Sequence, residues 1–320
     1  MIFSTIVALR NKYYDSQSHV KTSKIPVISI GNISSGGTGK TPTSIFLATK
    51  LQELGFHPVC IGRNIHPSSK KTILSEPKNP LSAEIIGDEL CLLQEKCSIP
   101  ILSTTSKSKA AVEFEEYLLQ HLAKPVYIID DGFQHRAISR SVDIVLVDDE
   151  TVNGHLIPFG INREPLSSLK RADIVLNFCK NSPNEFFHQY SSQVFTAKKT
   201  YSKPYFLRKE PKIDQKQILV ISSIAKPKKF RKDLLSQGYF IVGYKDFADH
   251  HSYNEKDIRR ISQEFQNSNA SYFVTTEKDV VKLKKYSDFC NSFPILVCPQ
   301  IVTIEDETMF LQKIVDKLPI

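Results

Sequence analysis

The sequence predicts an α/β protein of two domains, the larger of them built around a parallel β-sheet. Short apolar runs rich in β-branched residues alternate with segments of helical periodicity along most of the chain. Bare apolar strands between helices are typical of a parallel sheet that helices cover on both faces. The chain has 320 residues, whereas a single domain usually has about 150. Two successive α/β domains are therefore expected.

The first domain is expected to span residues 1–200. Continuous apolar runs predict its strands at 26–30, 58–62, 100–102, 126–129, 144–147 and 174–178. Apolar residues at helical spacing predict its packed helices at 42–54, 89–96 and 108–122. Gly55 directly follows the first of these helices, as expected for a helix that ends there.

Residues 201–216 interrupt this alternation, because they are rich in Lys, Pro and Glu, and we interpret them as a hinge. The alternation restarts in a second, smaller α/β domain at 217–320. Its strands are expected at 218–224, 239–242, 272–275 and 295–298, and its helices at 230–237, 254–265 and 305–317. We expect this second domain to close on the functional site of the first.

The composition excludes several classes of protein. Hydrophobic residues make up 41% of the chain and charged residues 24%, which supports packed cores and argues against disorder. The six cysteines form no CxxC pair and stand with no histidines at zinc-finger spacing, so free thiols in a reducing, cytoplasmic compartment are expected. The apolar runs are far shorter than a membrane span, and the N-terminus lacks a signal-peptide core.

The net charge of +8 favours an anionic partner, which could be a phosphate compound, a nucleic acid or an acidic lipid surface. The basic residues are scattered, and a solvated face explains even the densest group, 226–232. No zinc-finger, basic-zipper or RNA-binding sheet motif is present. We therefore expect no nucleic-acid partner, and no obligate protein partner is evident.

The strongest chemical signal is the run Ser34-Ser35-Gly36-Gly37-Thr38-Gly39-Lys40-Thr41, between the strand at 26–30 and the helix at 42–54. Glycines let backbone amides approach phosphate oxygens closely, and the helix N-terminus adds partial positive charge. Lys40 would reach the β- and γ-phosphates of a nucleotide, and Thr41 would ligate Mg²⁺. The strict pattern has Gly at the position of Ser34, so a Gly-rich turn without a ligand is the alternative. The strand–loop–helix context favours a P-loop NTPase-like domain.

A phosphate loop needs a neighbouring carboxylate to support its metal ion. Asp130-Asp131 follows the apolar strand at 126–129, at the end of a parallel sheet where ligands bind. One aspartate would hold Mg²⁺ directly or through water, and the other would orient water or substrate. An ordinary strand-end turn is the alternative, because Asp-Asp-Gly is also good turn chemistry. Asp148-Asp149 is a second pair of lower rank.

Further motifs follow one another along most of the chain. They are Ile30-Gly31-Asn32 before the phosphate loop, Gly87-Asp88-Glu89, Asp130-Asp131-Gly132-Phe133-Gln134-His135, Arg163-Glu164-Pro165-Leu166 with Leu169-Lys170-Arg171-Ala172-Asp173, Phe247-Ala248-Asp249-His250 and Thr276-Glu277-Lys278-Asp279. In order and spacing, these motifs resemble those of the lipid A 4'-kinases, the tetraacyldisaccharide 4'-kinase family. The motif from Asp130 to His135 is unusually specific.

The resemblance implies a defined reaction in lipid A, and hence lipopolysaccharide, biosynthesis. The family transfers the γ-phosphoryl group of ATP, with Mg²⁺, to the 4'-hydroxyl of a tetraacylated glucosamine disaccharide 1-phosphate. It works at the cytoplasmic face of the bacterial inner membrane and has two α/β/α domains joined by a hinge. Lys40, Asp130 and Asp131 would belong to the catalytic machinery.

By resemblance, Asp88 and His250 form the acid–base pair that takes the proton of the sugar hydroxyl. Asp88 would orient the imidazole and stabilise its charge. A helix cap is the alternative for Asp88, and a surface position is the alternative for His250. His251 is the less favoured base, because the matching family position tolerates other residues.

Other motif residues are candidates for binding the acceptor. Gln134 and His135 would hydrogen-bond the sugar or the γ-phosphate, or else belong to a post-strand turn. Arg163 and Arg171 would bind the anionic 1-phosphate, since a guanidinium fork suits phosphate, and surface ion pairs are the alternative. The run Glu277-Lys278-Asp279 has no clear role, and a helix cap is as well supported as a site.

The N-terminus carries a short amphipathic stretch followed by Arg10 and Lys12, which suits peripheral contact with a lipid interface. Family members usually begin with a longer apolar segment, so a small core helix is the alternative here. Two rival functions stay open for the whole chain: a membrane- or partner-regulated P-loop ATPase switch, and a nucleotide-binding regulatory protein without turnover. ATPases of the first kind usually carry Lys at the position of Ser35, which argues against that function.

Overall fold

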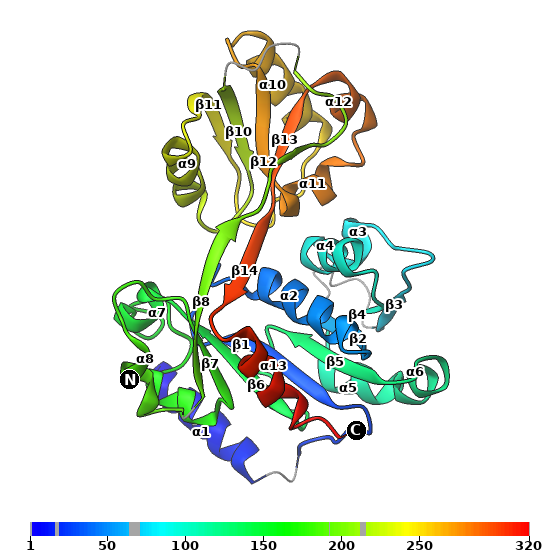
Figure 1. Cartoon of the computed structure of the whole chain (residues 1–320), viewed down its shortest axis with the longest axis vertical. Helices are drawn as coiled ribbons and strands as arrows, with labels where there is room; N and C mark the ends of the chain where they lie inside the picture. The colour runs from blue at the N-terminus through cyan, green and yellow to red at the C-terminus, as the bar shows by residue number, and fades with distance from the viewer. Residues whose placement is uncertain (1, 17–18, 64–70, 192, 212–215, 320) are drawn as a thin grey trace. The chain divides into compact units, whose positions relative to one another are not determined.

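The computed structural model describes all of the chain except residues 1, 17–18, 64–70, 192, 212–215 and 320, together with the side chains of 2–6 and 8. The chain forms two compact units (Figure 1). The first comprises Met1–Lys199 and Val302–Ile320, and the second comprises Thr200–Ile301. Each unit is an α/β structure with its own sheet, as the alternation of strands and helices predicts.

A nine-stranded sheet forms the centre of the first unit, in the order β14-β8-β7-β6-β1-β5-β2-β4-β3. Its strands are β1 (Val27–Asn32), β2 (His57–Arg63), β3 (Ile73–Ser75), β4 (Ile101–Thr104), β5 (Pro125–Asp130), β6 (Val142–Val147), β7 (Ile174–Asn177), β8 (Val194–Tyr201) and β14 (Gln300–Ile304). From β8 to β4 the neighbours pair in parallel, and β3 joins β4 antiparallel. The predicted parallel sheet is therefore confirmed, with β1 and β5 fully buried side by side at its centre.

The helices of the first unit are α1 (Ile2–Asp15), α2 (Lys40–Glu53), α3 (Ala83–Ile86), α4 (Asp88–Cys97), α5 (Lys107–Glu113), α6 (Glu115–His121), α7 (Asp149–Asn153), α8 (Asn184–His188), α13 (Glu307–Val315) and a 3₁₀ helix at Leu166–Arg171. The single helix expected at 108–122 is wrong, because α5 and α6 are separated at Phe114. The Phe114 backbone leaves helical geometry there, and its ring packs on the core below β2 and β5.

Helices cover both faces of this sheet. Ala110, Ala111 and Leu118 from α5 and α6 pack on one face, against side chains such as Val59 and Tyr127. On the other face, Phe310 of α13 contacts Phe46 of α2 and Phe195 of β8, with ring centroids 6.3 and 5.5 Å away. Two-sided cover explains why the central strands are bare apolar runs in the sequence.

The C-terminal segment returns to the first unit. Val302–Ile320 belongs with Met1–Lys199, which differs from the expected boundary that assigns all of 217–320 to the second domain. Alternating elements along a sequence do not reveal which sheet the chain rejoins.

Within the expected hinge at 201–216, β9 (Tyr205–Phe206) pairs antiparallel with β13 (Ile295–Cys298) of the second unit. The hinge there and the closing motion stay predictions.

The second unit has a five-stranded sheet in the order β11-β10-β12-β13-β9. Its other strands are β10 (Gln217–Ser222), β11 (Phe240–Asp246) and β12 (Tyr272–Thr276), and its helices are α9 (Pro227–Ser236), α10 (Glu255–Gln266), α11 (Glu277–Leu283) and α12 (Ser287–Ser292). Apart from β9, the paired strands are parallel. Leu219 and Phe273 point to one covered face, and Val220 and Val274 point to the other.

No helix in the part of the chain that the structure describes is long and apolar enough to cross a membrane. All six cysteines are free thiols, and only Cys179 among them is partly exposed.

Replacing Phe310 by Ala tests the return of the C-terminal segment to the first unit. Phe310 is fully buried, so the substitution should lower the free energy of unfolding by about 3–5 kcal/mol. Chemical denaturation followed by circular dichroism measures this loss. The neighbouring Met309 is 57% exposed, so Met309→Ala is the matched control and should change stability by less than about 0.5 kcal/mol. Equal stability of the two variants would contradict this packing.

Candidate phosphate-binding site

The site begins where β1 ends at Asn32 and a Gly-rich loop leads into α2, whose first residue is Lys40. This is the strand–loop–helix arrangement that phosphate binding requires. Gly36 and Gly39 adopt φ angles of 114° and 107°, which side chains rarely tolerate. The glycines are therefore needed to bend the loop around the N-terminus of α2.

Polar contacts from other segments fix the shape of the loop. The Asn32 side-chain amide donates a hydrogen bond to Thr38 Oγ1 at 2.9 Å, and Lys199 Nζ donates one to the Thr38 carbonyl at 2.8 Å. The Ser35 amide and hydroxyl both donate to the Ile161 carbonyl, at 2.7 and 2.9 Å. These contacts hold the loop in one conformation, which lowers the entropic cost of binding a ligand.

Ser34 stands where the strict phosphate-loop pattern has glycine. Its side chain turns into the protein, where it is 1% exposed and its hydroxyl lies 3.1 Å from the Thr151 hydroxyl. The side chain therefore does not fill the concave side of the loop, and the departure from the pattern is compatible with phosphate binding.

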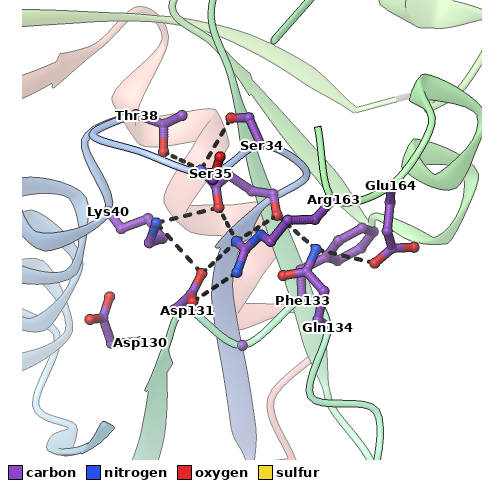
Figure 2. Close-up of polar contacts among 12 residues, drawn as sticks. Ser34, Ser35, Thr38, Lys40, Asp130, Asp131, Phe133, Gln134, Arg163 and Glu164 are labelled. Atoms are coloured by element: carbon purple, nitrogen blue, oxygen red, sulfur yellow. Dashed lines mark hydrogen bonds and ion pairs between the residues drawn. The ribbon is translucent and has the colours of Figure 1, made fainter. Parts of the chain in front are cut away.

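Asp131 connects the end of β5 to the phosphate loop and to the segment that contains Arg163 (Figure 2). Arg163 donates two parallel hydrogen bonds to the Asp131 carboxylate, at 2.8 and 3.0 Å, and Lys40 Nζ lies 3.5 Å from the same carboxylate. Asn32 Oδ1 accepts hydrogen bonds from both cations. The sequence predicts the closeness of Lys40 and Asp131, but it does not predict that Arg163 joins them.

The two neighbouring aspartates have opposite electrostatic environments. Burial raises the pKa of Asp130 to about 6, assisted by the charge of Glu89 and opposed by those of Lys40 and Lys107. Burial acts in the same direction on Asp131, but the hydrogen bonds from Arg163 and the charge of Lys40 outweigh it. They hold the pKa of Asp131 well below its usual range. Asp131 is therefore a firmly ionised group with two cationic partners, while Asp130 is a buried carboxyl group whose charge is costly.

The oxygen donors at this strand end fit Mg²⁺. Asp130 is 7% exposed, and the hydroxyl of Ser44 in α2 donates to it at 3.3 Å. Thr41 is the second residue of α2. Carboxylate and hydroxyl oxygens are the ligands that Mg²⁺ prefers, and a bound cation would stabilise the ionised form of Asp130 that burial disfavours. Asp131 already has its charge neutralised by Lys40 and Arg163.

Lys107 is a residue of this site that the sequence patterns do not reveal. It begins α5, it is 8% exposed, and its ammonium donates to the carbonyls of both Asp130 and Asp131. Burial lowers the pKa of Lys107, opposed by the charges of Asp131 and Asp130. Asp131 has a φ angle of 48°, in the left-handed region, and the lysine holds this turn in place. The one sequence feature that marks Lys107 is its position, shortly after the parallel strand β4.

Gln134 and His135 extend the turn that follows β5. The Gln134 side-chain amide donates to the Asn32 carbonyl at 2.9 Å and to Glu164 at 3.1 Å. The His135 ring accepts a hydrogen bond from the Ser108 amide through Nε2, at 3.3 Å. Burial and the charges of Lys107 and Arg140 lower the pKa of His135 to about 4, so the ring is neutral at pH 7. Gln134 therefore contacts the strand end that precedes the phosphate loop, whereas His135 contacts α5.

Arg171 lines a small cavity in the first unit. Its guanidinium pairs with Glu164 at 2.8 Å and lies 4.5 Å from the centre of the Phe133 ring. The cavity has a volume of about 280 Å³ and is also lined by Val7 and Asn11 of α1. Arg163 instead pairs with Asp131, so the two arginines have different carboxylate partners.

The remaining candidates divide between the units. Asp88 is the first residue of α4, follows the N-cap residue Gly87 and is 4% exposed, and its Oδ1 accepts a hydrogen bond from the Glu89 amide at 3.0 Å. His250 belongs to the second unit, where its ring lies 3.3 Å from Lys278 Nζ. His251 is held in its own unit by stacking on Phe247 and a 2.9 Å contact with Asp257. Because Asp88 and His250 lie in different units, their pairing stays a prediction.

The second pair of aspartates, Asp148 and Asp149, has structural roles. Asp148 caps α7 by accepting hydrogen bonds from the amide and hydroxyl of Thr151, at 3.0 and 2.8 Å. Asp149 accepts hydrogen bonds from the amides of Lys180 and Asn181. These contacts agree with the lower rank of the Asp148–Asp149 pair, relative to Asp130–Asp131, as a candidate metal site.

Comparison with known proteins identifies relatives across the whole chain. The family model described as tetraacyldisaccharide-1-P 4'-kinase matches residues 1–319. The tetraacyldisaccharide 4'-kinase of Desulfotalea psychrophila is 33% identical over 280 residues, covering 82% of this chain and 80% of that protein. That of Syntrophus aciditrophicus is 33% identical over 309 residues, covering 87% and 80%. The crystal structure of LpxK from Aquifex aeolicus in complex with ATP aligns with a TM-score of 0.80 at 27% identity, covering 99% of this chain and 96% of that one.

Replacing Lys107 by Met tests whether this buried lysine holds the strand end in its binding conformation. The loss of its hydrogen bonds to two carbonyls should weaken the binding of magnesium-ATP about tenfold, measured by isothermal titration calorimetry. Lys109, two residues later, is exposed, so Lys109→Met is the matched control and should bind normally. Equal affinity of the two variants would contradict the role of Lys107.

Proposed function

The chain belongs to the tetraacyldisaccharide-1-P 4'-kinase family, and we propose that the Lys40 loop, the aspartates at the end of β5 and the Asp88–His250 pair perform this family's reaction. The protein is an ATP-dependent kinase of lipid A biosynthesis. It phosphorylates the 4'-hydroxyl of a tetraacylated glucosamine disaccharide 1-phosphate. The assignment of individual residues to steps is our proposal.

The observation that carries this proposal is the cluster of Lys40, Asp131 and Arg163 beside the Gly-rich loop. Two cations surround one carboxylate, so the cluster retains net positive charge next to the N-terminus of α2. A triphosphate can take the place of Asp131 as a partner of Lys40 while the loop amides bind its other oxygens. Such a site binds a polyanion and stabilises the charge that develops during phosphoryl transfer.

The residues of the first unit would position the donor. Lys40 and the loop amides would hold the β- and γ-phosphates, and Arg163 would add a second cation close to them. Thr41 and Asp130 would hold Mg²⁺, with Asp131 nearby. When bound, this ion would neutralise phosphate charge and polarise the bond to the leaving group. Lys107 would keep the two aspartates in their observed turn.

The acceptor hydroxyl must lose its proton as it attacks. Its oxygen would form a bond with the γ-phosphorus, the bond from that phosphorus to the β-phosphate oxygen would break, and ADP would leave. The imidazole of His250 would take the hydroxyl proton, and the carboxylate of Asp88 would stabilise the resulting imidazolium. This step requires the two units to bring Asp88 and His250 to the same substrate.

Binding of the disaccharide is proposed for the region between the phosphate loop and α1. Gln134 is a candidate because its side-chain oxygen is buried and has no hydrogen-bond partner among the described residues. His135, a neutral ring, would bind a sugar hydroxyl or the γ-phosphate. Arg171 would bind the 1-phosphate, since its guanidinium faces a cavity next to α1. The position of Arg163 beside Asp131 favours the nucleotide over the 1-phosphate as its ligand.

Peripheral contact with the cytoplasmic face of the inner membrane is also a proposal. It is supported by the acylated substrate and by α1, on which Leu9 is 64% exposed and Tyr13 is 50% exposed. The side chains of Ile2, Phe3 and Ile6, which contribute to the expected apolar face, lie outside the described residues. We propose no nucleic-acid partner and no obligate protein partner.

Incubation of the purified protein with γ-labelled ATP, Mg²⁺ and the acylated disaccharide tests the proposal directly. Mass spectrometry should find one added phosphate on the disaccharide. Lys40→Ala and Asp88→Ala should each lose at least about a hundredfold in rate, because one removes a phosphate ligand and the other removes the partner of the base.

Lys50→Ala provides the matched control. Lys50 lies on the same helix as Lys40 but pairs with Glu53 and Glu307 on the surface, so its loss should leave the rate unchanged. Release of free phosphate without a phosphorylated lipid would support an ATPase switch. Normal transfer by both Lys40→Ala and Asp88→Ala would overturn the assigned roles.

A further inference from the structure

The Thr276–Asp279 motif, to which the reaction assigns no role, contains a completely buried carboxylate. Asp279 is 0% exposed and lies in the first turn of α11, in the second unit. Its Oδ1 accepts hydrogen bonds from the Ser223 amide at 3.0 Å, the Ser223 hydroxyl at 2.5 Å and the Tyr253 hydroxyl at 2.9 Å. Its Oδ2 accepts one from the Thr276 hydroxyl at 2.8 Å, and Lys282 Nζ lies 3.5 Å from Oδ1.

Capping of α11 explains only part of this arrangement. Thr276 is the N-cap residue, and its side chain accepts the hydrogen bond from the Asp279 amide. The contacts of Asp279 with Ser223 and Tyr253 reach residues far from α11 in the sequence. A buried charge is costly unless its hydrogen bonds are satisfied, so a carboxylate with this many donors ties several segments together.

Ser223 and Tyr253 connect this carboxylate to the loop that carries His250. Before this residue, the Phe247 amide donates to the Ser222 carbonyl at 2.8 Å. The His250 amide donates to the carbonyl of Ser223, at 3.3 Å, and Ser223 is the residue whose amide and hydroxyl bind Asp279. After it, Tyr253 donates its hydroxyl to the same carboxylate oxygen. Asp279 thus holds the loop 247–253 at two points, at Tyr253 directly and at the His250 backbone through Ser223.

His250 itself needs such support. Its φ angle is 60°, in the left-handed region that side chains rarely adopt, and such a conformation persists only where the surroundings enforce it. Its side chain is 37% exposed, and Lys278, the residue before Asp279, places its ammonium 3.3 Å from His250 Nε2. Two consecutive residues of α11 therefore act on His250, one on its ring and the other, through Ser223, on its backbone.

We propose that Asp279 is a positioning residue for His250, fixing the loop 247–253 so that the imidazole is presented in one orientation to the acceptor hydroxyl. This inference rests on the proposed role of His250 as the base. It gives a function to the Thr276–Asp279 motif, whose first residue caps α11, whose third contacts the histidine ring and whose fourth holds the histidine loop.

Two variants of the 320-residue chain test the proposal. Asp279→Ala removes the carboxylate, and Tyr253→Phe removes one of its donors while keeping the ring in the core. The second variant is the milder one and is expected to fold normally. Thr275→Val is the matched control, because its hydroxyl is equally buried and donates to the Ile221 carbonyl at 2.8 Å without contacting the loop.

Hydrogen exchange measured by mass spectrometry reports on the loop directly. Amides in 247–253 should exchange at least about tenfold faster in Asp279→Ala and severalfold faster in Tyr253→Phe than in the unmodified protein. Thr275→Val should leave exchange in this loop unchanged. Unchanged exchange in Tyr253→Phe and in folded Asp279→Ala would overturn the proposal.

Kinetics show whether the loop acts through His250. Tyr253→Phe should lower kcat several-fold and leave the KM for ATP unchanged, because the nucleotide site lies in the other unit. In a His250→Ala background, the same substitution should cause no further loss, since its effect passes through the histidine. If the two substitutions lowered kcat independently, so that their losses multiplied, the proposal would be overturned.

Normal transfer by His250→Ala would remove the proposed base. Hydrogen exchange alone would then decide whether Asp279 holds the loop 247–253.

Discussion

The contact of the Asp131 carboxylate with Arg163 and Lys40 is the interaction on which the rest of the site depends. It joins segments that are far apart in the sequence, and it does so because β1 and β5 are adjacent parallel strands whose ends meet at one edge of the sheet. Two cations around one anion leave net positive charge in a partly buried place. The site is therefore ready for a polyanion, while Lys40 and Arg163 remain ordered by their partners before it arrives.

Two aspartates that are adjacent in sequence acquire different properties from their surroundings. Asp131 is held ionised by cations, whereas burial makes the charge of Asp130 costly. Environments that push two carboxyl groups apart in pKa commonly separate their chemical roles. Here the separation supports the proposed roles of Asp130 at the metal ion and of Asp131 in arranging the cationic side chains. Lys107 links these roles, because it donates to the carbonyls of both residues.

The sequence predicts those features that depend on local pattern. The apolar strands, the Gly-rich loop before α2 and the aspartates at the end of β5 are all visible as short runs, and parallel neighbours bring their ends together. Features that depend on distant parts of the chain are not visible in this way. Lys107 and Arg163 reach the site from separate segments, the C-terminal α13 returns to the first unit, and the helix expected at 108–122 breaks where Phe114 packs on the core. In each case tertiary packing decides the outcome, and no local spacing encodes it.

A crystal structure of the protein with Mg²⁺ and a non-hydrolysable ATP analogue is the decisive measurement. The β- and γ-phosphates are expected on the amides of the Gly-rich loop, within hydrogen-bond distance of Lys40 Nζ, and the metal ion is expected beside Asp130 and Thr41. Arg163 should keep its contact with Asp131. A triphosphate bound elsewhere, or a metal ion remote from both aspartates, would show that this cluster does not form the nucleotide site.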